Sequence, residues 1–182
     1  MVAEISKLTK EIKHRGPDLI TRPVGRRMYA KIRDKMKNIS AHEVLLLDFE
    51  GIRVIDSSFI DELIVRLIID SWKSDPIFYV KLKNISIIAE INIDSVFKSF
   101  SQYNKNEIAV ITDGIRQNNS FYIGALSKVE REVIEYLRIN RNTSVHDIGV
   151  FIGMNDEEVS FLSDTLFRRR LLRIYNDHIS SV

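Results

Sequence analysis

The sequence predicts an α/β sheet with flanking helices, followed by a small, mainly helical C-terminal domain. Short apolar runs alternate with helical patterns up to residue 113, and closely spaced helical patterns begin after residue 125. Only seven Gly and three Pro interrupt the 182 residues, and 45% of the residues are apolar, so the chain can bury a core. We therefore predict two domains, residues 1–125 and 126–182.

The elements of the first domain follow from the spacing of its apolar residues. Three short apolar runs are typical of strands covered on both faces: residues 44–49, 77–82 and 108–111. Helical spacing predicts three helices: residues 24–37, 57–74 and 87–103. Residues 18–22 are expected to form an edge strand, and the polar segment 114–125 is expected to be a linker.

Three capping motifs predict the helices of the second domain. Each pairs a Ser or Asn with an acid three residues later: Ser127 with Glu130, Ser144 with Asp147, and Asn155 with Glu158. Gly153 is placed to end the second helix, and residues 171–175 (LLRIY) are expected to form a strand. These elements predict a compact unit of three helices and one strand.

Composition excludes several kinds of chemistry. The chain has no Cys, which excludes disulfides, Cys-ligated zinc, iron–sulfur clusters and thiol catalysis. The four His residues are scattered, and none has the spacing of a metal motif, so we expect neither a metal nor a cofactor. The N-terminus lacks the apolar stretch of a secretory signal, and no segment is apolar enough to span a membrane. We expect a soluble, cytoplasmic protein with no membrane partner.

Charge is concentrated at the N-terminus. The net charge is only +2, but residues 1–37 hold eleven Lys or Arg against four acids. This basic segment is interpreted either as a contact for nucleic acid or an acidic partner, or as a solvated helix face that balances the acidic middle of the chain.

The segment LLLDFEGIRVIDSSFIDELIVRLI, residues 45–68, resembles the signature of STAS domains, the fold of bacterial anti-sigma factor antagonists. The shared features are a buried strand, a short loop with an apolar tail, and Asp-Ser-Ser at a helix start. In that family a partner kinase phosphorylates the second Ser, which corresponds here to Ser58. In the family, the loop and helix around this serine form the surface that binds the partner. The resemblance therefore implies a partner-binding role for these further residues: Asp56, Ser57, Phe59, Asp61 and Glu62.

The chain departs from the antagonists at Phe59, where they have Gly. With this Ser-Phe pair, the sequence is more similar to a divergent STAS-like family whose biochemical role is not established; the resemblance covers residues 18–113. A phosphate on Ser58 would be stabilised by the N-terminus of the helix and would lie near Asp56, Asp61 and Glu62, whose repulsion could redirect a docked partner. The simpler alternative is that Ser57 or Ser58 only caps the helix.

Residues 126–175 resemble a winged helix-turn-helix. In DNA-binding members, the start of the third helix contacts base edges, but here that start carries Asp156, Glu157 and Glu158, which would repel phosphates. The candidate DNA-binding residues are instead basic residues at the far end of the helix and in the following strand: Arg168, Arg169, Arg170 and Arg173. Protein contact or dimerisation is the alternative use of this domain.

We expect a non-enzymatic bacterial regulatory protein, because no nucleophile, base and orienting group occur together. Its STAS-like domain is expected to bind a partner protein, a kinase or an anti-sigma-type regulator, and to be switched if Ser58 is phosphorylated. The alternative is a DNA-binding transcriptional regulator that reads DNA with its C-terminal domain. Homodimer formation stays open in both hypotheses.

Overall fold

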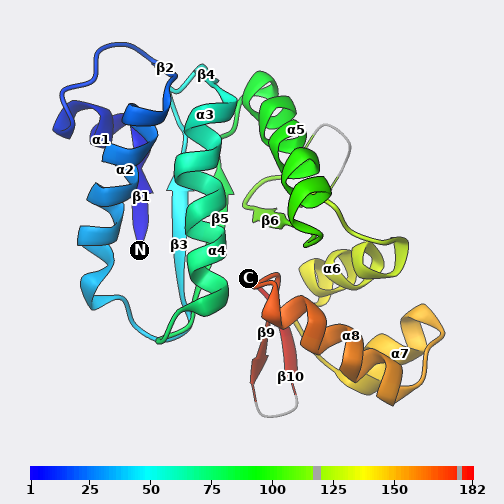
Figure 1. Ribbon diagram of the computed structural model, residues 1–182. Helices are drawn as coiled ribbons and strands as arrows, with labels where there is room; N and C mark the ends of the chain where they lie inside the picture. Colours follow the sequence, from blue (N-terminus) through cyan, green and yellow to red (C-terminus); the bar gives the residue numbers. More distant parts are fainter. Residues whose placement is uncertain (117–119, 176–177) are drawn as a thin grey trace.

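The computed structural model describes residues 1–116, 120–175 and 178–182 (Figure 1). Its main sheet has five strands in this order: β1 (Val2–Glu4), β3 (Glu43–Asp48), β5 (Phe78–Lys83), β6 (Ala109–Thr112) and β7 (Tyr122–Gly124). The first four are parallel, and β7 is antiparallel to β6. Leu45 pairs with Val80 and Leu47 with Leu82, so the apolar runs of the sequence form the centre of the sheet. The mixed α/β architecture is consistent with a STAS-like fold.

Helices cover one face of this sheet. They are α1 (Ile5–Glu11), α2 (Arg22–Lys35), which ends in a 3-10 turn η1 (Met36–Asn38), and α5 (Ile87–Asn104). Between α2 and α5 in the chain lies one continuous helix of three segments: α3 (Ser57–Ile60), the π-helical η2 (Asp61–Val65) and α4 (Arg66–Lys73). In Figure 1, α2 and the α3–α4 helix lie side by side across the sheet. A short parallel pair, β2 (Asp18–Leu19) with β4 (Val54–Ile55), lies before α3.

Among its described residues, the C-terminal part contains three helices and a three-stranded antiparallel sheet. Its elements are α6 (Lys128–Asn140), β8 (Asn142–Ser144), α7 (Val145–Ile152), α8 (Asp156–Arg168), β9 (Leu172–Tyr175) and β10 (His178–Ser181), with strand order β8-β10-β9. All three predicted capping boxes are formed, at Ser127, Ser144 and Asn155. Gly153 ends α7 with a φ of 72°, as predicted.

Two hydrophobic cores lie on opposite faces of the sheet. Because successive strand residues point to opposite faces, Phe78 and Val80 of β5 pack in the larger core with the helices. Tyr79 between them is fully buried in a second core, which also contains Ile111 of β6 and Leu166 of α8. The C-terminal part therefore packs against the sheet, and the predicted domain boundary at residues 125/126 lies between β7 and α6. Independent folding of the two parts stays a prediction.

The structure adds elements that the sequence patterns did not predict. Residues 2–11 form β1 and α1, and β1 extends the sheet because its backbone pairs with β3. The expected linker contains β7, whose Ile123 is fully buried; residues 117–119 of that linker lie outside the described residues. The expected edge strand at residues 18–22 is limited to Asp18–Leu19, since α2 begins at Arg22. Within the described part of the chain, every helix is too short or too polar to cross a membrane.

Candidate functional site

The helix after β4 begins at Asp56, and the side chain of this residue is its cap. Asp56 Oδ1 accepts a hydrogen bond from the Phe59 backbone N–H at 2.7 Å. Its Oδ2 accepts a second one from the Thr21 backbone N–H at 3.1 Å, which ties the start of α2 to the start of α3. The interpretation that Ser57 or Ser58 caps this helix is therefore wrong, because Asp56 occupies the cap position one residue earlier and its side chain accepts the Phe59 N–H.

The two serines are left at the surface. Ser57 is exposed and Ser58 is half-buried, and neither hydroxyl has a hydrogen-bond partner within the described residues. Both line an open depression of about 350 Å³ between the start of α3 and one side of α5. The other residues of its wall are mostly polar: Arg22, Asp61, Ser95, Val96, Ser99, Phe100, Tyr103 and Asn104. We call this surface the serine depression.

Phe59 does not belong to the surface. Its side chain is fully buried in the larger core. Asp61, two residues further along the helix, lies at the surface, where its side chain is 44% exposed. The assignment of Phe59 to a partner surface is therefore wrong: a large apolar side chain at this helical position faces the core, and its burial stabilises the fold.

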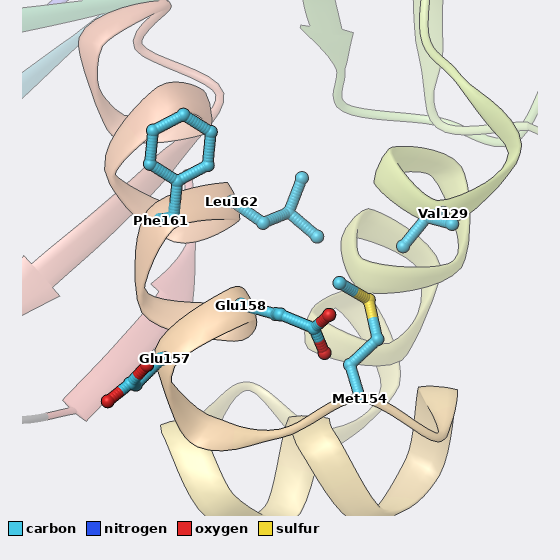
Figure 2. Close-up of a pocket in the computed structure, with 6 residues that line it drawn as sticks. All are labelled: Val129, Met154, Glu157, Glu158, Phe161 and Leu162. Atoms are coloured by element: carbon cyan, nitrogen blue, oxygen red, sulfur yellow. The ribbon is translucent and has the colours of Figure 1, made fainter.

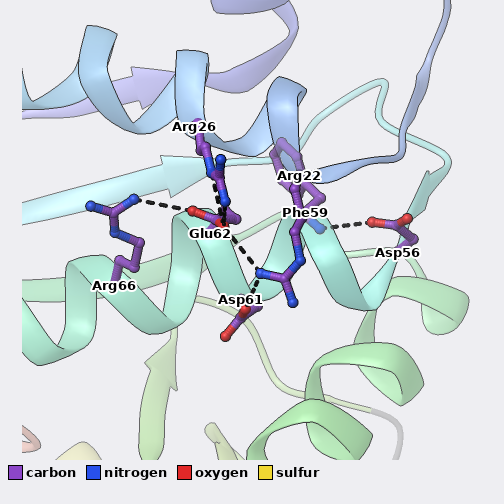
Figure 3. Close-up of polar contacts among 7 residues, drawn as sticks. All are labelled: Arg22, Arg26, Asp56, Phe59, Asp61, Glu62 and Arg66. Atoms are coloured by element: carbon purple, nitrogen blue, oxygen red, sulfur yellow. Dashed lines mark hydrogen bonds and ion pairs between the residues drawn. The ribbon is translucent and has the colours of Figure 1, made fainter.

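Glu62 is a buried carboxylate surrounded by three arginines (Figure 3). Its Oε1 accepts hydrogen bonds from Arg22 and Arg26 of α2, both at 3.0 Å, and its Oε2 accepts one from Arg66 at 3.1 Å. The bonds from these guanidinium groups, first of all from Arg26, lower the pKa of Glu62 to about 2. Glu62 is thus not an exposed acid beside Ser58, because its side chain is buried and is paired with arginines of α2 and α4.

The packing of α2 explains how the arginines reach this carboxylate. A Cβ built at Gly25 would lie 2.9 Å from the Cβ of Glu62 and 3.2 Å from the carbonyl oxygen of Phe59. Only glycine permits this close approach of the two helices. The contact falls at η2, where the helix widens to π geometry, a feature that often marks functional sites.

Arg22 links this cluster to the serine depression. Its Nη1 donates to Asp61 Oδ2 at 2.7 Å as well as to Glu62. In the sequence, Arg22 and Arg26 belong to the basic N-terminal segment, and Arg66 lies in the helix predicted for residues 57–74. The i,i+4 spacing of Glu62 and Arg66 is a local signal for that pair. No local pattern connects Arg22 and Arg26 to a carboxylate about forty residues away.

The four candidate DNA-binding arginines do not form one exposed surface. Arg170 is buried and donates to the carbonyl oxygens of Ser71 and Trp72 at 2.8 and 3.4 Å. Arg169 donates to Glu130 at 2.8 Å and to the Ala125 carbonyl oxygen at 2.6 Å. Arg173 is half-buried, with its guanidinium 5.2 Å from the centre of the Tyr79 ring. Arg168 alone of the four is exposed, because the others connect the C-terminal part to the rest of the fold or to α6.

The described residues contain no group of three or more His, Asp or Glu side chains placed to hold a metal ion.

The profile of a family described as a STAS-like domain of unknown function (DUF4325) matches residues 24–70. This segment runs from α2 through β3 to α4 and includes Gly25, Arg26, Asp56, both serines and Glu62. No curated protein matches the chain. The family match therefore covers the α3 side of the serine depression and most of the Glu62 cluster, whereas Arg22 and the α5 side of the depression lie outside it.

Proposed function

We propose that this chain is a non-enzymatic bacterial regulatory protein whose STAS-like part binds a partner protein at the serine depression. The supporting observation is that Asp56, and not a serine, caps α3. Neither Ser57 nor Ser58 is therefore needed to cap the helix, and both line the open serine depression. The adjoining side chains combine hydroxyl groups, a cation and an anion, a surface suited to polar recognition of a protein such as a kinase or an anti-sigma-type regulator.

Phosphorylation of Ser58 is the switch in this proposal. A phosphate there would bring a charge of about −1.5 to −2 to the wall that holds Arg22 and Asp61. It would compete with Asp61 for the Arg22 guanidinium and would be favoured by the N-terminus of the helix. The charge of the surface presented to the partner would change while the core around Phe59 stays intact.

The C-terminal part is proposed to be a winged-helix-like module. The chain order of α6, β8, α7, α8, β9 and β10 and the antiparallel sheet support this assignment. DNA reading by this module, the second candidate function, has one supporting feature, the exposed Arg168 at the end of α8. Carboxylates in the first turn of α8 and the engagement of the other three arginines favour protein contact instead.

Site-specific photo-crosslinking in the native host tests the partner surface. A benzophenone amino acid replaces Ser57 in the full chain, and a matched variant carries it at Lys37, an exposed position that does not line the depression. We expect one defined protein to be crosslinked from position 57 only. Adding Ser58→Asp to the position-57 variant should reduce this product severalfold. Equal products from both positions, or none from position 57, would contradict the proposal.

A further inference from the structure

The C-terminal part carries an apolar groove of about 440 Å³ between α6 and α8. Its apolar lining comes from three chain segments: Val129 of α6, Met154 before α8, and Phe161 and Leu162 of α8. Figure 2 shows Leu162 and Met154 directed toward Val129, with the Glu158 side chain beside Met154. Phe161 lies on the outer side of the helix, so the apolar surface extends beyond the groove.

Phe161 is the most exposed apolar residue of this groove. Its side chain is 78% exposed, whereas Val159 and Leu166 on the same helix are fully buried. A single exposed apolar residue is ordinary on protein surfaces. Here, however, Phe161 lines the same groove as half-buried Leu162 and Met154, and an apolar surface with a polar rim is typical of a protein contact.

The charge around the groove identifies the kind of partner. Asp156, Glu157, Glu158 and Asp164 are all exposed on α8, and Arg168 follows only at its end. On the α6 side, the ammonium of Lys128 lies 3.8 Å from a Glu132 carboxylate oxygen, which offsets its charge. The rim beside Phe161 is therefore acidic. It would repel the phosphates of DNA and attract a basic peptide segment.

We propose that this groove is a second docking site, separate from the serine depression, for a segment of a partner protein. The segment would carry an aliphatic or aromatic anchor with Lys or Arg beside it. The anchor would fill the space between Val129, Met154 and Leu162 and pack against Phe161, and the basic residues would pair with Glu157 and Asp164. An apolar anchor supplies affinity, and the acidic rim supplies selectivity for charge.

The test uses a display library of random 15-residue peptides, panned on the full chain and counter-selected on Phe161→Ala. We expect the peptides that depend on Phe161 to have a positive net charge and at least one large apolar residue. One of these peptides, synthesised with a fluorophore, is then titrated by anisotropy. Phe161→Ala should weaken its binding at least tenfold. Glu157→Lys should weaken it severalfold and reduce the dependence of binding on salt concentration.

Ile139→Ala is the matched control, because Ile139 lies on α6, is 79% exposed and does not line the groove. It should leave peptide binding unchanged, and thermal melts should show that all three variants fold. Absence of Phe161-dependent peptides, or selection of acidic ones, would overturn the proposal. So would binding of a 30-base-pair duplex lost in Phe161→Ala, or self-association of the chain lost in the same variant, since each assigns the groove to another occupant.

Discussion

Replacing Glu62 by Gln tests whether the buried carboxylate connects α2 to the π-helical segment. Gln has nearly the same shape, so the substitution removes the charge and leaves the packing intact. Three guanidinium groups, those of Arg22, Arg26 and Arg66, then lose their common anionic partner. Asp61→Asn is the matched control, because Asp61 directly precedes Glu62, is 44% exposed and pairs with Arg22.

The magnitude follows from the pKa of Glu62. Folding lowers this pKa from 4.5 to about 2; at about 1.4 kcal/mol per pKa unit, the charged form contributes at most about 3.5 kcal/mol. The arginine side chains are 46–62% exposed, so solvent screens part of this energy. We therefore expect Glu62→Gln to lower the free energy of unfolding at pH 7 by about 2 kcal/mol, or the melting temperature by about 4–8 °C.

The pH dependence has a defined sign. Because the pKa is lower in the folded state, the carboxylate stabilises the fold fully above pH 4.5 and loses this contribution as the pH falls toward 2. The difference between wild type and Glu62→Gln should therefore shrink through this window. Urea unfolding followed by circular dichroism at pH 7, 5.5, 4 and 3 measures it.

Asp61→Asn should change the free energy of unfolding by no more than about 0.5 kcal/mol, since exposed ion pairs contribute little. Equal destabilisation by Asp61→Asn and Glu62→Gln would refute the central role of the buried carboxylate. A difference between wild type and Glu62→Gln that grows as the pH falls below 4.5 would refute the assignment of the lowered pKa.

Two further stability predictions follow from single contacts. Asp56→Ala should lower the free energy of unfolding by about 1–2 kcal/mol in a thermal melt, because it removes the cap of α3. Ser58→Ala should change it by no more than about 0.5 kcal/mol, and equal losses in the two variants would show that the serine also caps. Arg170→Met should lower the free energy of unfolding by about 1–3 kcal/mol, because the Ser71 carbonyl oxygen loses this donor. Arg168→Ala should leave the free energy of unfolding nearly unchanged in the same assay. An Arg170→Met variant as stable as wild type would contradict the connecting role of that side chain.

Local patterns in the sequence were sufficient for much of the secondary structure. The three capping boxes formed where they were predicted because each depends on residues within a single helical turn. The apolar runs at residues 44–49 and 77–82 became neighbouring central strands, since strands buried on both faces must be apolar throughout. The Asp-Ser-Ser motif also placed the start of a helix within one residue.

The roles of the individual side chains depended on the tertiary structure. Asp, Ser and Ser can all cap a helix, and Asp56 is selected because it meets both the Phe59 N–H and the distant Thr21 N–H. Glu62 looks like an ordinary surface acid until α2 packs against it. Arg170 looks like part of a basic patch until the C-terminal part packs on α4. Long-range packing decides which charges are buried, and burial decides whether a charge holds the fold together or faces a partner.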